Sequence, residues 1–579
     1  MRRSSSTRLM ECHPARFCVW ALCIAFVVIY LIGLAWRPLV VPDEARYAVI
    51  PLEMIRTGEW IVPHLLGIEY FEKPVLGYWM TAVSFLFFGE NAFSLRLPSA
   101  LMTGIMAWML VLFVRRWTGR WDLAALGGLV LLTSLEPAVI GTTAILDAPF
   151  SGLVVATIVC FYLGTRAVGG RRFGWLIASG VACGCAFLTK GFLAFAFPVL
   201  VLAPWLAWEG RWRDLFTLPW IPLIATVLTA LPWSLAVHQH ATEYWDYFFW
   251  HEHIHRYTAG EAAQHPEPWW MFGFSLLVGL IPWIFALPLV VSGLLRRGFG
   301  SPESRLLVCW LVIPIVFLSF SSGKLPTYIL PCFPAAAALI AVGLVERFKH
   351  QPAAGRAAER LPGGVLIVLG VLAIVITPWV PMQYAEGGPW LDGGTWRLVL
   401  VGVALLWWGL ADWWSLTAVQ PQRRIAIGGL AAMLAFVAIP LALPTGWMMT
   451  SKVPMPFLSQ WEDLARNSRS LVDCDLMHAA QFAWPDTQVD VYGRAGELQW
   501  GMKKFDHTSR GRQVYREALP EAVADATPER PLLMVAKVPL VRLNWIERLV
   551  NAGQIPQPAV LIEDDILVAV WPEEAAPFK

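Results

Sequence analysis

Residues 17–47 read FCVWALCIAFVVIYLIGLAWRPLVVPDEARY, and this stretch decides the class of the protein. Its first part, 17–36, is apolar, and about 20 apolar residues are what an α-helix needs to cross the hydrocarbon core of a bilayer. The run follows the basic segment Met1–Arg16 and lacks a small-residue cleavage site, so we predict a first span that is retained. An acidic pair, Asp43 and Glu44, comes directly after that span.

The composition extends this interpretation to the whole chain. Of its 579 residues, 57% are hydrophobic and only 15% are charged, whereas soluble domains carry about 25% charged residues. This excess, together with 32 tryptophans and 42 prolines, predicts a polytopic membrane protein. It excludes a disordered chain, a coiled coil and a collagen, and the nine cysteines show no disulfide framework. A net charge of +2 gives no reason to expect a nucleic-acid partner.

Apolar runs divide the chain into candidate spans. They are 17–36, 75–88, 95–114, 122–140, 148–165, 174–189, 191–208, 216–237, 269–295, 304–320, 325–345, 362–381, 396–414 and 425–446. The run 75–88 is too short to cross comfortably, so we expect an interfacial or re-entrant helix there and about 13 spans in all. After Met448 the charges return, and a small α/β domain is predicted from strand-like segments at 488–492, 531–537 and 558–571 and a helical one at 544–552.

Loop charge orients these spans. Basic residues are enriched in cytoplasmic loops, and all basic clusters fall on one side of the membrane if 75–88 does not cross. The clusters are Arg2/Arg3/Arg8/Arg16, Arg115/Arg116/Arg120, Arg166/Arg171/Arg172, Arg211/Arg213, Arg296/Arg297/Arg305, Arg347/Lys349/Arg356/Arg360 and Arg423/Arg424. We therefore predict a mainly α-helical transmembrane domain over 1–447, with its N-terminus in the cytoplasm and interfacial helices in outer loop 37–94. The C-terminal α/β domain, 448–579, is predicted to be extracytoplasmic.

Acidic residues open the first loop on the outer face. Asp43 and Glu44 begin a segment that predicts a helix through Arg56, ended by Gly58. Asp43 is either the N-cap of this helix or a carboxylate that faces a cavity. An ionisable side chain at the membrane is costly, so the second interpretation makes Asp43 a candidate functional residue.

Other ionisable residues share this face. Glu72 and Lys73, in YFEKP at 70–74, are expected at headgroup depth, where the lysine either snorkels or holds a lipid phosphate. Four further residues stand at the ends of apolar runs, namely Asp147, Lys190, Lys324 and Tyr328. Each has an ordinary role as a cap, turn or anchor, but their convergence on one face predicts an extracytoplasmic active site.

A short metal motif supports a different function. His251, Glu252 and His255 form H-E-x-x-H, which on a helix places two imidazoles on one face for zinc, with the glutamate as general base. The motif lies in an aromatic loop outside any predicted span, and apart from His265 no third ligand follows. A membrane zinc protease is therefore one alternative, and a solvated histidine-rich loop on an aromatic belt is another.

Taken together, these motifs resemble a known family. PDEARY at 42–47, GEWIVP at 58–63 and YFEKP at 70–74 are similar to the early part of the bacterial aminoarabinose transferases of lipid A. Further similar stretches are LTKG at 188–191, HEHIHR at 251–256, QHPEP at 264–268 and GKLPTYILP at 323–331. More broadly, the chain resembles the C-type glycosyltransferases, which include protein mannosyltransferases and oligosaccharyltransferases. Where the family often has proline after LTKG, this chain has Phe192.

The resemblance implies a C-type glycosyltransferase in the bacterial inner membrane, which transfers 4-amino-4-deoxy-L-arabinose from undecaprenyl phosphate to a lipid A phosphate with inversion. It implies no required cofactor, although family members can carry a divalent metal at positions like Glu72 and His251. Positions associated with the prenyl phosphate match Lys73, Arg256 and Tyr328. The implied catalytic acids are Asp43 and Asp147, and the implied ligands of acceptor or sugar are Glu44, Tyr70, Lys190 and Lys324.

Two further alternatives concern the substrate and the class of protein. Relatives with the same scaffold transfer galacturonic acid or amino-hexoses, and these motifs do not define the sugar pocket. A polytopic transporter or flippase also has many spans. Transporters usually show internal repeats and charges near mid-membrane, however, whereas the polar residues here cluster at one face. The C-terminal domain is expected to cap that face or gate the acceptor.

Overall fold

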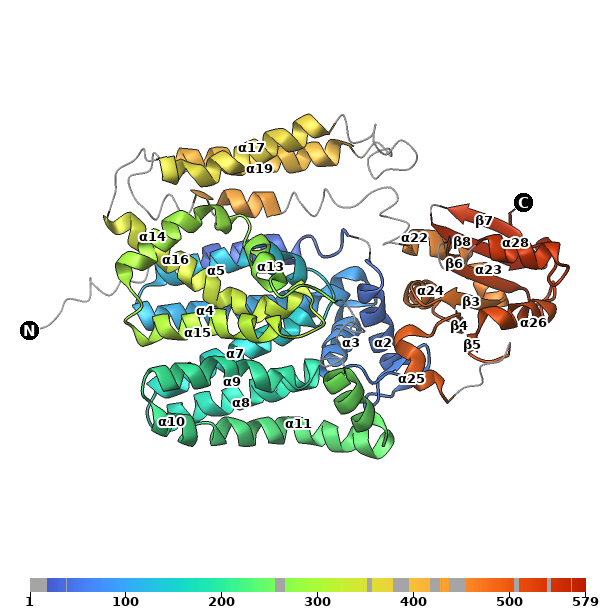
Figure 1. Ribbon diagram of the computed structural model, residues 1–579, viewed down its shortest axis with the longest axis horizontal. Coiled ribbons are helices and arrows are strands. Elements are labelled where there is room, and N and C mark those ends of the chain that lie inside the picture. Colours follow the sequence, from blue (N-terminus) through green and yellow to red (C-terminus); the bar gives the residue numbers. More distant parts are fainter. Residues whose placement is uncertain are drawn as a thin grey trace, which may run out of the picture.

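A bundle of long helices and a smaller mixed sheet make up the structure, a computed structural model (Figure 1). It describes residues 18–37, 39–255, 266–350, 357–377, 395–416, 427–428, 430–436, 454–504, 510–538, 543–563 and 565–578. The sheet lies at the end of the bundle that carries α2 (Asp43–Thr57) and α3 (Leu76–Phe88). The loop after the first apolar helix and the C-terminal part of the chain are therefore neighbours in space.

Among the described residues, six helices are long and apolar enough to cross a membrane. They are α4 (Ala92–Thr118), α7 (Asp147–Arg166), α8 (Gly170–Lys190), α11 (Trp220–His240) joined to α10 (Trp212–Thr217), α15 (Pro302–Ser319) and α16 (Phe333–His350) joined to η5 (Pro326–Cys332). The number is eight if two bent pairs each make one span: α5 (Trp121–Leu132) with α6 (Leu135–Gly141), and α13 (Met271–Gly279) with η4 (Trp283–Ala286) and α14 (Leu287–Arg297).

Shorter apolar helical stretches are Cys18–Leu31, α3, α9 (Leu193–Trp208), Arg360–Ile376 within α17 (Ala357–Ile376) and Val399–Ser415 within α19 (Thr395–Ser415). A multi-pass helical membrane protein is thus confirmed, while a total of about 13 crossings stays a prediction because it needs these shorter helices. Helix α3 has 13 residues, about 20 Å of helix, which is shorter than the hydrocarbon core. Its predicted placement in the interface is consistent with that length.

The two bent pairs support each other. The bend between α5 and α6 is 67°, and that between α13 and α14 is 94°. Such breaks leave backbone groups without intrahelical partners, and these must be satisfied inside the protein where water is absent. The Leu135 N–H donates to the Ile281 carbonyl at 3.0 Å, and the Trp283 indole donates to the Thr133 hydroxyl at 3.0 Å. Each break therefore supplies hydrogen-bond partners to the other.

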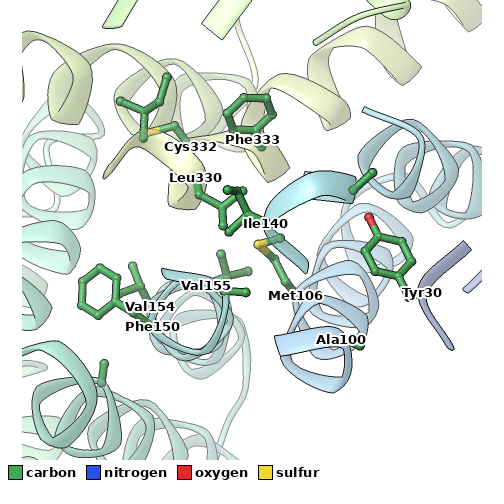
Figure 2. Close-up of a cluster of buried hydrophobic side chains, with 14 of the residues drawn as sticks. Tyr30, Ala100, Met106, Ile140, Phe150, Val154, Val155, Leu330, Cys332 and Phe333 are labelled. Atoms are coloured by element: carbon green, nitrogen blue, oxygen red, sulfur yellow. The ribbon is translucent and has the colours of Figure 1, made fainter. Parts of the chain in front are cut away.

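Helix α7 lies at the centre of the bundle, with 89% of its most apolar window buried. Figure 2 shows Phe150 and Val154 of α7 among side chains from neighbouring elements. These neighbours include Met106 of α4, Ile140 of α6 and Leu330 of η5. In a bilayer, close packing of this kind holds helices together, because apolar surface gains little by leaving lipid. The packing of α7 also fixes the position of its first residue, Asp147.

Ion pairs gather the predicted cytoplasmic loops at one end of the bundle. Arg172 lies 3.8 Å from Asp214, and Arg305 lies 3.0 Å from Glu209, so loops distant in the sequence meet there. Figure 1 shows α10 and α14 at this end, opposite the C-terminal sheet. A basic end is therefore separated from the end that carries α2 and α3, as the sequence predicts. Which end faces the cytoplasm stays a prediction.

The C-terminal part of the chain forms a six-stranded sheet in the order β5-β4-β3-β6-β8-β7. Strands β3 (Arg469–Asp473), β4 (Val489–Tyr492), β5 (Gln513–Val514) and β6 (Leu532–Lys537) are parallel, and β7 (Ala559–Glu563) and β8 (Ile566–Trp571) add an antiparallel pair. The strands predicted at 488–492 and 531–537 are confirmed as β4 and β6, and α28 (Leu543–Asn551) confirms the predicted helix. Segment 558–571 is two strands, and the prediction omits β3 and β5.

The sheet region contacts the hairpin of β1 (His64–Leu65) and β2 (Ile68–Glu69). The Arg512 guanidinium donates to the Leu66 carbonyl at 2.8 Å, and Lys504 pairs with Glu69 at 2.5 Å. Gly501 packs so tightly that a Cβ added to it would lie 2.6 Å from the Glu69 carbonyl oxygen. Backbone, charge and shape therefore all hold the C-terminal region against this loop.

Candidate active site

Glu44 is the centre of a buried network at the start of α2. Its carboxylate accepts two 2.7 Å hydrogen bonds from the Arg96 guanidinium of α4. Arg37 lies 3.3 Å away, and the N–H groups of Val40 and Ala144 donate at 2.9 and 3.0 Å. Burial favours the neutral acid, but the bonds and charges of Arg96 and Arg37 outweigh it and hold the pKa of Glu44 below its ordinary value. Both carboxylate oxygens are thus used within the protein, an arrangement that positions the loop, while the expected contact of Glu44 with acceptor or sugar stays a prediction.

Asp147, Lys190 and Tyr328 come together from distant parts of the sequence. The Lys190 ammonium lies 2.6 Å from the Asp147 carboxylate and 4.7 Å from the centroid of the Tyr328 ring. Asp147 is in the first turn of α7 and Lys190 in the last turn of α8, so each charge also suits the dipole of its own helix. The side chains of Lys190 and Asp147 are only 12% and 15% exposed, so most of the pair is buried. Their predicted convergence is confirmed.

Asp43 connects to the C-terminal region through two ion pairs. It is 55% exposed in the first turn of α2 and pairs with Arg46. Arg46 in turn pairs with Glu497 of the short helix η7 (Gly496–Leu498). The other Glu497 oxygen lies 2.6 Å from Nε2 of His478 in α24 (Met477–Ala483). Although burial favours the neutral form, the charges of Arg46 and His478 hold the pKa of Glu497 well below its ordinary value.

Tyr47 lies within electrostatic reach of both predicted catalytic acids. Burial raises the pKa of its phenol, and the negative charges of Asp43 and Asp147 act in the same direction. Helices α2 and α7 begin at these acids, with Pro42 and Leu146 in the cap positions, so the N-cap interpretation of the acids is wrong. Neither carboxylate is used as a helix cap, and their partners are Arg46 and Lys190.

Tyr70, Glu72 and Lys73 form the next part of the network. The buried Tyr70 hydroxyl lies 3.2 Å from the Glu72 carboxylate and 3.3 Å from that of Glu497. Lys73 pairs with Glu252 and donates to the Glu72 carbonyl at 2.9 Å. Burial, together with the charges of Glu252 and Glu497, raises the pKa of Glu72 to about 7. Glu72 therefore changes its protonation state near neutral pH.

Comparison with known proteins places this arrangement in a family. The family of dolichyl-phosphate-mannose-protein mannosyltransferases matches residues 16–248. The undecaprenyl phosphate-alpha-4-amino-4-deoxy-L-arabinose arabinosyl transferase of Aeromonas salmonicida is 37% identical over 530 residues, which cover 90% of this chain and 93% of the relative. The chain belongs to this family of aminoarabinose transferases. The protein of the same name from Aeromonas hydrophila is 34% identical, covering 93% of this chain and 95% of its own.

Solved structures show the fold of the aminoarabinose transferases in this chain. ArnT from Cupriavidus metallidurans bound to undecaprenyl phosphate superimposes with a TM-score of 0.79 at 24% identity, covering 97% of this chain and 99% of that one. Its apo structure gives 0.79 at 23% identity, covering 98% and 100%. The resemblance inferred from the motifs is confirmed, and the chain is a membrane glycosyltransferase.

Two residues expected in the aminoarabinose transferase site lie outside what the structure describes. Arg256 falls in the segment 256–265, and His251 is described only as part of the backbone of η2 (Asp246–His255). Lys324 is described, and its ammonium donates to the Glu267 carbonyl at 2.8 Å. Since only 5% of Lys324 is exposed, its contact ties two loops together and leaves little surface for the expected contact with acceptor or sugar.

The surroundings of Glu72 test the expectation of a metal. The described residues contain no group of three or more His, Cys, Asp or Glu side chains that is placed to hold a metal ion. Glu252 lies near Glu72, but it is already the counterion of Lys73. The described side chains therefore do not fit a metal centre by themselves. The family of the chain argues against the zinc protease alternative, and its proposed general base, Glu252, is the counterion of Lys73.

Four residues of this site were not selected from the sequence: Arg46, Arg96, His478 and Glu497. Arg96 stands within the predicted span 95–114, and a charge inside a span is a usable signal for a functional or structural role. Arg46 is part of PDEARY and lies three residues after Asp43, a spacing at which opposite charges meet on a helix. His478 and Glu497 lie in an α/β region whose local pattern contains nothing that links them to a loop some 400 residues earlier.

Proposed function

We propose that the protein transfers 4-amino-4-deoxy-L-arabinose from undecaprenyl phosphate to a phosphate of lipid A at the periplasmic face of the inner membrane. One observation carries the proposal: the chain is 37% identical, over 90% of its length, to a relative named for this donor lipid and this sugar. The ionisable residues at the sheet end of the bundle support it, because donor and acceptor are both phosphates that need charged partners.

In the proposed reaction an oxygen of the acceptor phosphate attacks C1 of the sugar from the face opposite the donor phosphate. The C1–O bond to the acceptor forms as the C1–O bond to undecaprenyl phosphate breaks, and the leaving oxygen takes the electron pair. The configuration at C1 is therefore inverted. The acceptor phosphate is already ionised at neutral pH, so the reaction needs no strong general base.

The donor phosphate is proposed to bind Lys73, together with Arg256 and Tyr328. Lys73 has the Glu252 carboxylate as its counterion, and an incoming phosphate replaces that carboxylate by a charge-assisted hydrogen bond. Neutralising the charge that develops on the leaving oxygen is expected to be a large contribution, since loss of one such donor costs about 10²–10³-fold in kcat.

The two acids at this end are proposed to act on the sugar. Asp43 and Asp147 stabilise the positive charge that develops at the anomeric carbon. Lys190, 2.6 Å from Asp147, is placed to receive the acceptor phosphate while the carboxylate faces the sugar. Tyr70 and Lys324 act through their protein contacts, with Tyr70 holding Glu72 and Lys324 holding a loop carbonyl.

A transfer assay tests the function. Purified protein is supplied with labelled undecaprenyl phosphate–aminoarabinose and lipid A, and labelled lipid A is the expected product. Asp43→Asn and Lys73→Ala are expected to lower kcat by about 10²-fold or more, while the exposed Glu90→Gln keeps the wild-type rate. No product from wild-type protein contradicts the function, and full rates in both variants contradict the residue roles. Faster transfer from a galacturonic acid or amino-hexose donor assigns that sugar instead.

The orientation and domain division are part of the proposal. We place the N-terminus in the cytoplasm, the membrane domain over 1–447 and a periplasmic α/β domain over 448–579, and the arginine-rich end of the bundle supports this orientation. Reporter fusions at Gly119 and Ser459 are expected to lie on opposite sides of the membrane. A cytoplasmic Ser459 contradicts a periplasmic active site.

A further inference from the structure

We propose that the C-terminal region completes the active site through Glu497, a positioning residue that fixes Arg46 and Tyr70. The inference deepens the proposed sugar transfer and rests on it, because Arg46 and Tyr70 contact the residues to which roles in that reaction are assigned. It gives the C-terminal region a direct part in the reaction, beyond covering the membrane domain.

Glu497 stands in the middle of a continuous chain of polar contacts. Its Oε2 atom pairs with Arg46 and lies 3.3 Å from the Tyr70 hydroxyl. Arg46 pairs on its other side with Asp43, and Tyr70 lies 3.2 Å from the carboxylate of Glu72. One carboxylate from the C-terminal region therefore joins the acid proposed to act at the anomeric carbon to the loop that presents the donor-binding lysine.

Burial makes this carboxylate necessary. The side chains of Arg46 and Glu497 are only 15% and 12% exposed, and that of His478 is 2% exposed. A guanidinium so far removed from water needs a charged partner, since a buried unpaired charge is costly. Without the charge of Glu497, Arg46 would turn more fully toward Asp43. That acid would then be neutralised and less able to stabilise positive charge on the sugar.

The backbone around Glu497 is held by the contact that docks the sheet region. Gly496 has φ 56°, in the left-handed region that glycine adopts without strain. The helix α25 (Gln499–Met502) follows, and its Gly501 leaves no space for a side chain against Ile68. The position of Glu497 is thus determined by the packing of α25 on the β1–β2 hairpin, and it is rigid enough to orient Arg46.

A positioning role predicts kinetic effects that a purely structural contact does not. Glu497 contacts Arg46 and Tyr70 and does not touch Lys73, which is proposed to bind the donor phosphate. The variant Glu497→Gln is therefore expected to lower kcat without a comparable change in the donor KM.

The test compares full-length Glu497→Gln with wild type and with Glu563→Gln, an exposed glutamate at the end of β7. Rates are expressed per mole of folded protein, measured by size-exclusion chromatography. For Glu497→Gln we expect kcat to fall by about 10–100-fold, as for a misplaced reacting group, with the donor KM changed less than about threefold. Glu563→Gln is expected to behave as wild type.

A second variant keeps the inference testable if Glu497→Gln does not fold. Tyr70→Phe removes only the hydroxyl 3.3 Å from Glu497, and loss of one hydrogen bond predicts about a fivefold lower kcat. Wild-type kcat values in the folded fraction of either variant, or a donor KM in Glu497→Gln that rises as much as kcat falls, overturn the inference. Wild-type protein that transfers no sugar contradicts the proposed function instead, so the two failures are distinct.

Discussion

The buried pair of Glu44 and Arg96 allows a quantitative prediction about stability. Arg96→Met removes both 2.7 Å bonds to Glu44 and the bonds of 2.7 and 2.6 Å that Arg96 donates to the carbonyls of Leu34 and Arg37. Because the side chains of Arg96 and Glu44 are only 0% and 1% exposed, water cannot replace these partners. Breaking a buried pair by removing one partner costs about 3–5 kcal/mol, and we expect a loss of that size.

An exposed pair in the same loop provides the control. Arg56 lies 3.2 Å from Glu90, and the two side chains are 40% and 48% exposed. Surface pairs of this kind contribute about 0–1 kcal/mol, so Arg56→Met is expected to be nearly neutral. The contrast isolates burial as the cause, since both variants replace arginine with methionine.

The assay is a graded SDS titration of the protein in mild detergent, with the free energy of unfolding extrapolated to zero SDS. A double-mutant cycle with Glu44→Gln completes the assay, because the double variant no longer contains a buried carboxylate charge without its arginine partner. We expect the double variant to lose less than the sum of the single losses, by about 1–3 kcal/mol. The reasoning is refuted if Arg96→Met lowers the free energy of unfolding no more than Arg56→Met does. It is also refuted if the double variant loses the full sum of the two single losses.

Three further predictions concern catalysis and pH. Asp147→Asn is expected to lower kcat by about 10²-fold in the transfer assay with little change in donor KM, and an unchanged kcat contradicts its role. Tyr328→Leu removes the ring 4.7 Å from the Lys190 ammonium, and the lost cation–π contact predicts a KM increase of about 2–5-fold. Lys190→Met loses the same contact, so adding Tyr328→Leu to it is expected to raise KM no further. Glu72 has a folded pKa of about 7 against an ordinary 4.5, so between these values the folded protein keeps a proton that the unfolded chain releases. The contribution of Glu72 to stability is therefore fully present below about pH 4.5 and is lost as pH rises through about 7. Thermal melts across this range check it, and the part of the slope that Glu72 supplies is expected to be absent in Glu72→Gln.

The helical part of the fold was predictable because lipid imposes a simple rule. Each span must be apolar over a fixed length, so runs such as 95–114 and 148–165 correspond to α4 and α7. The bends were not predictable, since the hydrogen bond between Leu135 and Ile281 joins segments with no shared local pattern. In the sheet, the short strand β5 has only two residues, too few for an alternating pattern to be recognised.

Some residues of the candidate site could also be predicted from the sequence, and others could not. Asp147, Lys190 and Tyr328 were predictable because an ionisable or polar residue at the end of an apolar run must meet others on the same face. The pairing of Glu44 with Arg96 was not, since Glu44 lies in the outer loop and Arg96 in the predicted span 95–114, and the sequence does not specify which span a loop packs against. Glu497 could not be found at all, because its relation to Arg46 exists only after the sheet has folded and docked.

The late position of Glu497 also bears on how the protein is made. A ribosome adds about 5–20 residues per second, so the 424 residues from Lys73 to Glu497 take about 20–85 s to synthesise. Throughout that interval the first loop has already been translated, but Arg46 lacks its carboxylate. On the proposed role of Glu497, a nascent or prematurely terminated chain can enter the membrane without acting on the carrier lipid. Activity then starts only when the last quarter of the polypeptide has been made and folded, so each molecule is switched on by its own completion.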